Sequence, residues 1–322
     1  MKFRTEIEVK PLKRSIDYSS NIMSLGSCFA TNMAERLAER KFRVCSSPTG
    51  ILFNPASIAL SIELMAKGYR ITESDLVECN GGFSSYLFHS DFSSSDKSTA
   101  LEQMQQALSR GSKALESASH LIITLGTAWV YRLKESGEVV ANCHKQPASI
   151  FSRELLTTEQ IINNLKTILR HTSAHLILTI SPVRHLGEGM EDNSLSKALL
   201  RVAVAEFARR HSERVDYFPA FEALIDDLRD YRFYGEDLVH PSKMAVDYIA
   251  ERFFEAALTT QSKALMPSVE RIVKAASHRP QNPNSEQHKT FCMKQLEAIR
   301  NIKGVDLSKE SEYFEQMLQI NL

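Results

Sequence analysis

The sequence lacks an excess of charge of either sign, because 39 Lys and Arg residues balance 39 Asp and Glu residues. A formal net charge of zero leaves no electrostatic basis for binding nucleic acid or an anionic membrane surface. No run approaches the roughly 18 apolar residues that a membrane span needs, and residues 1–6 lack the apolar core of a secretory signal. We therefore expect no nucleic-acid partner, no membrane span and a cytoplasmic location.

Cysteine is scarce, and its arrangement excludes two common uses of the residue. Its five positions show no CxxC pair and no Cys/His ligand spacing, which argues against a disulfide framework and a structural zinc site. We expect no bound metal and no dissociable cofactor. In a reducing compartment, a single cysteine can instead serve as a nucleophile. The five are Cys28, Cys45, Cys79, Cys143 and Cys292.

What the 322 residues do contain is an alternation of short apolar runs and segments with helical spacing. Strands are predicted at 21–26, 42–45, 121–125, 175–180 and 215–218, with a hairpin between 129 and 140. Helices are predicted after residue 28, at 56–66, from 157 to at least 168, after 193 and at 241–257. This alternation predicts a mostly parallel sheet with helices on both faces. The carboxyl ends of its strands, where functional residues gather, would hold residues 26–28 and 126–127.

Two of the predicted helices have marked apolar positions. In the first helix, one face carries Phe29, Met33, Leu37 and Ala38. The helix after residue 193 carries Leu195, Leu199, Val202 and Phe207.

The composition changes beyond Leu265, where prolines and asparagines between 280 and 284 interrupt the chain. Amphipathic helices are predicted at 286–301 and 308–320. We predict an α/β domain over residues 1–262 and a helical C-terminal extension over residues 263–322. The extension would either cover the site or join two copies as a homo-oligomer.

A first candidate for chemistry is Gly26-Ser27-Cys28, at the junction of the first strand and the first helix. A glycine permits a tight turn, and a nucleophile at a helix start meets free backbone N–H groups and the positive end of the helix dipole. Both effects favour a thiolate and stabilise an oxyanion. The alternative is that Cys28 is a small buried filler and Ser27 an N-cap.

A second candidate is Asp237-Leu238-Val239-His240. A carboxylate three residues before a histidine can accept the Nδ1–H of the ring, which leaves the other nitrogen free as a general base. The alternative is that His240 caps the helix that follows. A nucleophile near the start of the chain and Asp-x-x-His near its end form a specific order, so each motif strengthens the other.

These motifs resemble those of a known family. Gly26-Ser27-Cys28-Phe29-Ala30 is the pentapeptide that names the GSCFA family, and the segments at 125–129, 181–185 and 237–242 follow in that family's order. The resemblance extends from Ile22 to Phe254. It implies a relative of SGNH (GDSL-type) hydrolases, which have a flavodoxin-like three-layer α/β/α fold and cleave or transfer acyl groups.

The resemblance implies roles for the residues of both motifs. Cys28 stands where the superfamily has its serine nucleophile, and Ser27 is the other choice. A thiol needs less activation than a hydroxyl, which favours Cys28. His240 would be the general base, oriented by Asp237.

The oxyanion hole implied by the resemblance is matched only in part. Its glycine would be Gly50, with Asn54 nearby as a side-chain donor. The Gly-x-Asn block of the superfamily matches Gly126 and Thr127, but Ala128 follows where the asparagine would stand. Losing one oxyanion donor typically lowers the rate about 10²–10³-fold, so another group would have to substitute. The candidates are Asn54, Asn142 and the backbone N–H of Cys28.

Arg184 follows the strand at 175–180 and should lie at the same edge of the sheet. A substrate contact and a loop-anchoring ion pair suit its position equally.

We predict an acyl-ester hydrolase or acyltransferase that acts on an acyl ester of a small molecule or a glycan. The alternative is a catalytically degenerate module that binds carbohydrate or protein. Trp129 would then stack on a sugar face.

Overall fold

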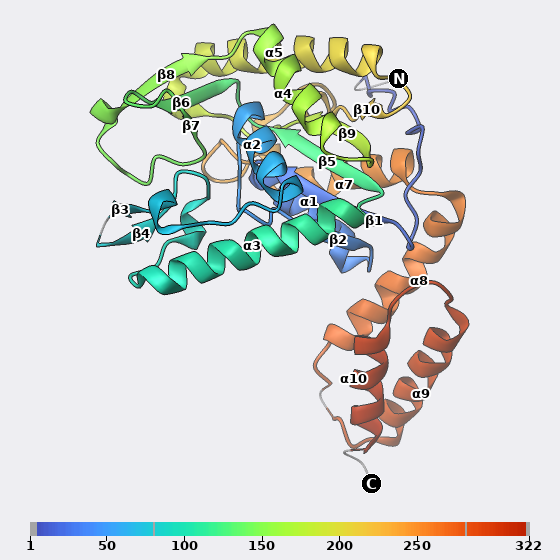
Figure 1. The fold of residues 1–322 in the computed structure, drawn as a ribbon. Helices are drawn as coiled ribbons and strands as arrows, with labels where there is room; N and C mark the ends of the chain where they lie inside the picture. The colour runs from blue at the N-terminus through green and yellow to red at the C-terminus, as the bar shows by residue number, and fades with distance from the viewer. Residues whose placement is uncertain (1–4, 80, 281, 320–322) are drawn as a thin grey trace.

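The computed structural model describes residues 5–79, 81–280 and 282–319, and it consists of an α/β body and a projecting helical unit (Figure 1). Five parallel strands at the centre of the body have the order β10-β9-β5-β1-β2. Numbered within this sheet alone, the order is 2-1-3-4-5, that of flavodoxin-like folds, and the predicted fold class is confirmed. The strands are β1 Asn21–Gly26, β2 Arg43–Ser46, β5 His120–Leu125, β9 His175–Ile180 and β10 Val215–Tyr217.

Successive residues of the central strands face two separate cores, because side chains of a strand alternate between the faces of its sheet. Leu121 and Ile123 of β5 pack in one core, whereas Ile122 packs in the other. Every residue of β5 and of β9 is buried. Burial on both faces explains why the sequence shows these strands as continuous apolar runs.

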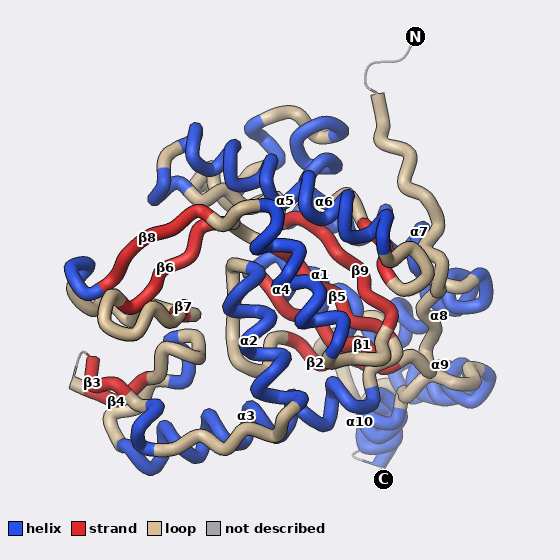
Figure 2. The backbone as a smooth tube through the Cα atoms, turned by 45° about the horizontal axis from the view of Figure 1, so that its top comes forward, coloured by secondary structure: helices blue, strands red, loops and turns tan. Residues whose placement is uncertain are grey.

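Helices cover both faces of the sheet, and Figure 2 shows α2, α4 and α5 together in front of it. Buried residues of α2, α3, α4 and α5 share the core of Leu121, whereas those of α1 and α7 share the core of Ile122. These helices are α1 Cys28–Glu39, α2 Pro55–Ala66, α3 Lys97–Ser117, α4 Thr158–Arg170, α5 Met190–Arg210 and α7 Lys243–Ala257.

The start of α4 has the capping box that the sequence predicts. Thr157 Oγ1 accepts the N–H of Gln160 at 3.2 Å, and Gln160 Oε1 accepts the N–H of Thr157 at 2.7 Å. Helix α3 was not predicted, although its sequence carries comparable signals. Asp96 caps its first turn, and Met104 and Leu108 are buried one turn apart.

The buried faces of α1 and α5 differ in part from the apolar positions seen in the sequence. On α1, Ala34 is buried, whereas Ala38 is exposed. On α5, Phe207 is buried, but Leu195 and Val202 are 48% and 58% exposed. Small and polar side chains occupy much of the face of α5 that packs on the sheet. Its buried residues are Asn193, Ser196, Lys197, Leu200, Ala203, Val204 and Phe207.

Two small antiparallel sheets flank the central one. The predicted hairpin is confirmed as β6 Trp129–Leu133 and β7 Val139–Val140, and β8 Phe151–Leu155, which was not predicted, pairs with the other edge of β6. The second sheet joins β3 Val77–Cys79 to β4 Gly82–Ser84. The remaining short helical turns are α6 Ala220–Glu222, a π-helix at Ala223–Asp227, and 3-10 turns at Glu73–Asp75, Ser90–Phe92, Ala148–Ile150, Leu186–Glu188 and Tyr231–Phe233.

The C-terminal unit consists of α8 Thr260–Ser277, α9 Glu286–Asn301 and α10 Ser308–Gln319, which project from the body (Figure 1). Helices α9 and α10 match the two predicted helices, except that residue 320 lies outside the described residues. The predicted boundary at residue 262 falls within α8. Phe314 of α10 and Cys292 of α9 are fully buried in this unit. None of the described helices combines the length and apolarity that crossing a bilayer requires.

Candidate active site

The Gly26-Ser27-Cys28 segment forms a turn that requires glycine at its first position. Gly26 has φ +140°, and a Cβ there would lie 2.1 Å from the backbone oxygen of Thr124 on β5. The N–H of Ser27 donates to the same oxygen at 3.2 Å. This contact ends β1 against β5 and places Cys28 as the first residue of α1, at the carboxyl end of the sheet.

The two candidate nucleophiles occupy different environments. Ser27 is fully buried, and its Oγ donates to Ser181 Oγ at 2.9 Å in the loop after β9. Cys28 is half-buried, so part of it reaches the surface. Of the two side chains, Cys28 is the one that a substrate can approach.

Burial controls the ionisation of Cys28. It raises the pKa of the thiol, while the backbone N–H groups of Phe29 and Cys28 and the Lys197 ammonium lower it and the Asp237 carboxylate raises it. The backbone N–H groups at the helix start therefore favour the thiolate, as expected, but desolvation outweighs them. Cys28 rests as a thiol near pH 7 and needs a base to become a nucleophile.

Asp237 and His240 form the hydrogen-bonded pair that their spacing predicts. Asp237 Oδ2 lies 2.6 Å from His240 Nδ1, and Asp237 Oδ1 accepts the backbone N–H groups of Val239 and His240 at 2.9 and 3.0 Å. These backbone bonds and the imidazole lower the pKa of Asp237 to about 2, so it stays ionised. Leu238 adopts φ +55° to close this tight loop.

The pair is open to solvent and does not cap a helix. The side chains of Asp237 and His240 are each 51% exposed. Helix α7 begins at Lys243, and its cap is Ser242, whose Oγ accepts the N–H of Ala245 at 3.3 Å. The capping role considered for His240 is thus taken by Ser242, and the ring is left for another purpose.

This loop lies at the same edge of the sheet as Cys28, because the backbone N–H of Arg184, in the loop after β9, donates to Val239 O at 3.2 Å. Asp237 is near enough to raise the pKa of the Cys28 thiol. His240 is near enough to help lower the pKa of His185, in the loop after β9, to about 4, although burial is the largest cause. No hydrogen bond joins Cys28 to His240 within the described ranges, so proton transfer between them would need a movement of the loop or a bound substrate.

The residues proposed for the oxyanion hole have other partners. The N–H of Gly50 donates to Ser47 O at 2.8 Å, and a Cβ on Gly50 would lie 2.2 Å from His89 Cβ. Asn54 Oδ1 caps α2 by accepting the N–H of Ser57 at 2.8 Å. The Gly50 N–H is thus already used, whereas the N–H groups of Cys28 and Phe29, the first two of α1, are among those that helix geometry leaves without intrahelical partners.

Gly126 and Thr127 mainly hold the scaffold together. Their N–H groups donate to Phe53 O at 2.7 and 3.0 Å, and Thr127 Oγ1 lies 3.0 Å from Ser196 Oγ on α5. Ser196 Oγ also accepts the N–H of Ala128 at 2.7 Å. These contacts fix the turn after β5.

One face of the Trp129 ring is covered by Arg153. The guanidinium of Arg153 lies 3.7 Å from the centroid of this ring. This cation–π contact occupies one face of the ring, and the role of Trp129 as a sugar platform stays a prediction.

Arg184 anchors the Asp237–His240 loop. Its N–H donates to Val239 O at 3.2 Å, and its Nη1 donates to Leu238 O at 3.3 Å. The guanidinium also lies 4.0 Å from the ring centroid of Tyr234 and 5.2 Å from that of Tyr231. Carbonyl and aromatic contacts thus provide the anchoring for which an ion pair was considered.

One residue of this edge, Lys197, was absent from the sequence-based candidates. It is 2% exposed, and its Nζ donates to Gly126 O at 2.6 Å and to Ser181 O at 2.7 Å. The sequence signal that could have found Lys197 is its position on α5. The helical spacing of Ser196, Leu200 and Phe207 defines the buried face, and Lys197 lies on that face.

A match to a family profile shows which protein family the chain belongs to. The profile of the GSCFA family matches residues 21–253. The chain belongs to the GSCFA family. A second profile, that of the C-terminal domain of GSCFA domain proteins, matches residues 269–320. The described residues among these, 269–280 and 282–319, lie in the projecting helical unit.

Comparison of this GSCFA chain with known proteins adds little on function. No curated protein matches it. A solved structure from Streptococcus pneumonia, titled provisionally as a platelet activating factor, is 12% identical, with 73% of this chain and 83% of that chain covered and a TM-score of 0.37. A family 3 carbohydrate esterase from Clostridium thermocellum is 10% identical, with 77% and 98% covered and a TM-score of 0.36. Likeness at this level carries no information on activity.

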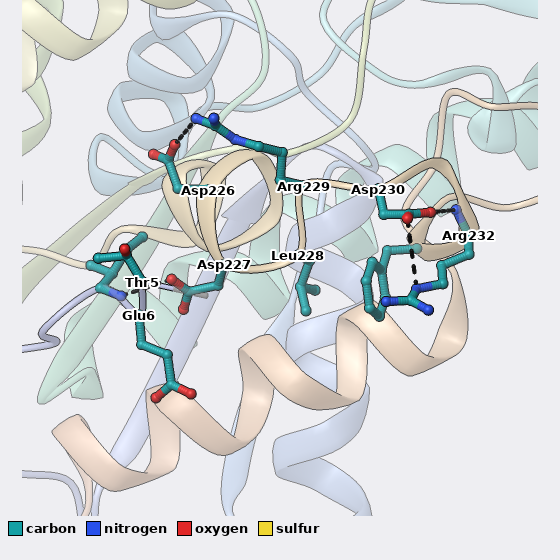
Figure 3. A pocket seen from close by; sticks show the side chains of 10 residues that line it. Thr5, Glu6, Asp226, Asp227, Leu228, Arg229, Asp230 and Arg232 are labelled. Atoms are coloured by element: carbon teal, nitrogen blue, oxygen red, sulfur yellow. Dashed lines mark hydrogen bonds and ion pairs between the residues drawn. The ribbon is translucent and has the colours of Figure 1, made fainter. Parts of the chain in front are cut away.

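A cavity of about 750 Å³ lies elsewhere in the GSCFA chain, between its N-terminal segment and the turns at 226–233 (Figure 3). Asp227 anchors that segment by accepting the N–H of Ile7 at 2.7 Å. None of the proposed catalytic residues lines this cavity. Across the described residues, no cluster of three or more His, Cys, Asp or Glu side chains could hold a metal ion.

Proposed function

We propose that this GSCFA chain is a hydrolase-like enzyme that cleaves or transfers acyl groups, with Cys28 as its nucleophile and His240 as its base. The observation that carries the proposal is the 2.6 Å Asp237–His240 pair within electrostatic reach of a half-buried cysteine at a helix start. Nucleophile, base and orienting carboxylate are the three parts of an acyl-transfer site.

In the first half-reaction, His240 Nε2 accepts the proton of the Cys28 thiol as sulfur attacks the carbonyl carbon of an ester. A C–S bond forms, and the carbonyl π electrons move to oxygen. Collapse of this intermediate breaks the C–O bond, and His240 returns its proton to the leaving alkoxide. Asp237 holds the Nδ1–H throughout and remains a carboxylate, consistent with its pKa of about 2.

In the second half-reaction, water or an acceptor hydroxyl attacks the thioester carbon and gives its proton to His240. The C–S bond breaks, and Cys28 leaves and recovers a proton from His240. A thiol whose pKa is raised by burial fits this scheme, because the thiolate forms only as the base takes the proton.

The oxyanion would be stabilised by the backbone N–H groups of Cys28 and Phe29, which already lower the pKa of the thiol beside them. Asn54 remains a proposed additional donor through its amide nitrogen, since its oxygen caps α2. The proposed substrate is an acyl ester of a small molecule or a glycan, and the proposed location is the cytoplasm.

The test is to trap the acyl-enzyme. The protein is mixed with short-chain aryl esters and with acetylated oligosaccharides, and adducts are located by peptide mass spectrometry. We expect an adduct on Cys28 that is absent from Cys28→Ala and retained in Ser27→Ala. An adduct on residue 27 that survives Cys28→Ala would transfer the role to Ser27, and a wild-type protein that neither forms an adduct nor hydrolyses any ester would refute the proposed activity.

A further inference from the structure

A buried lysine lies at the carboxyl ends of the strands that carry the proposed site. Lys197 reaches inward from α5 and is 2% exposed. Lysines are almost never fully buried unless their charge is compensated, because desolvating an ammonium is costly. Gly126 O and Ser181 O, at 2.6 and 2.7 Å, are two of the groups that compensate it. They follow β5 and β9 directly, so one ammonium holds two neighbouring strand ends.

This ammonium is connected to the nucleophile turn through a short chain of contacts. Ser181, whose carbonyl Lys197 binds, accepts the hydroxyl of Ser27 at 2.9 Å. Ser27 in turn donates its N–H to Thr124 O on β5 and precedes Cys28. The turn that presents Cys28 thus rests on the strand ends that Lys197 fixes.

The charges around Cys28 come from three elements. The backbone N–H groups at the start of α1 and the Lys197 ammonium on α5 favour a thiolate, whereas Asp237 in the loop before α7 opposes it. Titratable imidazoles belong to His240 in that loop and to His185 after β9. Lys197 is therefore a buried positive charge held at the strand ends next to the nucleophile turn, and such a charge is screened far less than one at the surface.

We propose that Lys197 is a positioning residue of this site, whose buried ammonium stabilises negative charge at Cys28 while it fixes the strand ends beneath the nucleophile turn. The inference rests on the proposed function for the role of Cys28 as nucleophile. The inference assigns a function to the buried Lys197 ammonium, whose desolvation is costly and which the Asp237–His240 mechanism does not use.

The experiment measures the reactivity of each cysteine without reference to turnover. Iodoacetamide alkylation is followed by peptide mass spectrometry between about pH 6.5 and about pH 10 in wild type, Lys197→Met and Lys197→Gln. Methionine and glutamine are each one atom shorter than lysine. Methionine is unbranched and uncharged, and glutamine is uncharged but keeps N–H donors for the carbonyls. We expect both variants to alkylate Cys28 about tenfold more slowly at a given pH below the midpoint, with the midpoint moved upward.

Two controls separate this effect from loosened structure. Cys45 in the same molecule is half-buried and responds to Arg110 instead, so its rate should not change. Arg201→Met removes a positive charge from α5 one turn beyond Lys197, where it pairs with Glu222 at 2.7 Å, and should leave Cys28 unchanged. Lys197→Arg keeps the charge and should retain the wild-type profile.

The proposal is overturned if folded Lys197→Met or Lys197→Gln keeps the wild-type pH profile of Cys28, or if Lys197→Arg loses it. Uniformly faster alkylation of all five cysteines would assign Lys197 a structural role alone and would also overturn it. Ester turnover enters none of these readouts, so a protein without esterase activity would remove the proposed function and leave the measurement on Cys28 interpretable.

Discussion

The central sheet carries a His–Asp pair near each of its two ends. At the carboxyl end, His240 Nδ1 lies 2.6 Å from Asp237 Oδ2, and each side chain is 51% exposed. At the amino end, His175 Nε2 lies 2.8 Å from Asp216 Oδ2, and these side chains are 4% and 11% exposed. The distances are nearly equal, so the contact itself does not separate a catalytic pair from a structural one; exposure and the remaining partners do.

At the amino end, the partners belong to the scaffold. Asp216 Oδ2 also accepts the backbone N–H of Lys13 at 2.9 Å, and His120 next to the pair lies 3.2 Å from Arg14 O through its Nε2. The rings of His120 and His175 pack edge to face, 6.2 Å apart. This end of the sheet therefore holds the N-terminal segment in place, and both rings are buried, with His120 1% and His175 4% exposed.

Replacing His240 and His175 one at a time is the strongest test of the difference between the two His–Asp pairs. His240→Gln should lower kcat/KM for a reactive ester about 10²–10⁴-fold, because it removes the general base, while the melting temperature stays within about a degree of wild type. His175→Gln should do the reverse and lower the melting temperature with little change in kcat per folded molecule. Equal loss of activity in both variants would contradict the assignment of separate roles.

Replacing each of the two aspartates in turn should also distinguish the structural pair from the catalytic pair, here by the loss of stability. Asp216→Ala leaves the N–H of Lys13 and the ring of His175 without their acceptor in a buried place, and should cost about 3 kcal/mol of unfolding free energy. Asp237→Ala removes an exposed carboxylate and should change stability far less while lowering kcat. Urea unfolding followed by circular dichroism, together with ester kinetics, measures both. Comparable destabilisation by the two substitutions would show that Asp237 has a structural role as well.

The amino end should also make the fold sensitive to acid. Burial lowers the pKa of His120 from 6.5 to about 4. Between these values the unfolded chain binds a proton that the folded chain does not, so stability falls as the pH drops from about 6.5 towards about 4, by about 2–3 kcal/mol. In His120→Gln this part of the loss should vanish. Unfolding free energies at several pH values test it, and parallel curves for wild type and variant would contradict it.

Much of the sheet could be predicted because its strands are buried on both faces and appear as continuous apolar runs. The carboxyl-end pair was visible too, since Asp237 and His240 are close in the sequence and the loop between them is local. The amino-end pair was not visible, because His175 and Asp216 meet only through the pairing of β9 with β10. Forty-one positions separate them, and no local spacing records such a contact.

The role of α5 illustrates a second limit. Leu195 and Val202 are apolar but exposed, while Ser196 and Lys197 are polar but buried. Hydrophobic periodicity assumes that the buried face is the apolar one. That assumption fails at the carboxyl ends of β5 and β9, where open carbonyl groups need donors. Functional edges of a sheet are thus the places where this kind of prediction is weakest.

The smallest effect, and the one that most sharpens the contrast between the two pairs, concerns Arg184. The exposed pair lacks the burial that holds His175 and Asp216, so its geometry depends on the hydrogen bonds within its own loop and on the contacts of Arg184 with Leu238 O and the ring of Tyr234. Arg184→Met should lower kcat about tenfold, roughly 1.4 kcal/mol in activation free energy, with KM nearly unchanged, because the loop that carries His240 loosens. Arg184→Lys should not restore the rate, since an ammonium cannot reproduce the planar contact with the ring. A rise in KM at constant kcat would instead show that Arg184 binds the substrate directly.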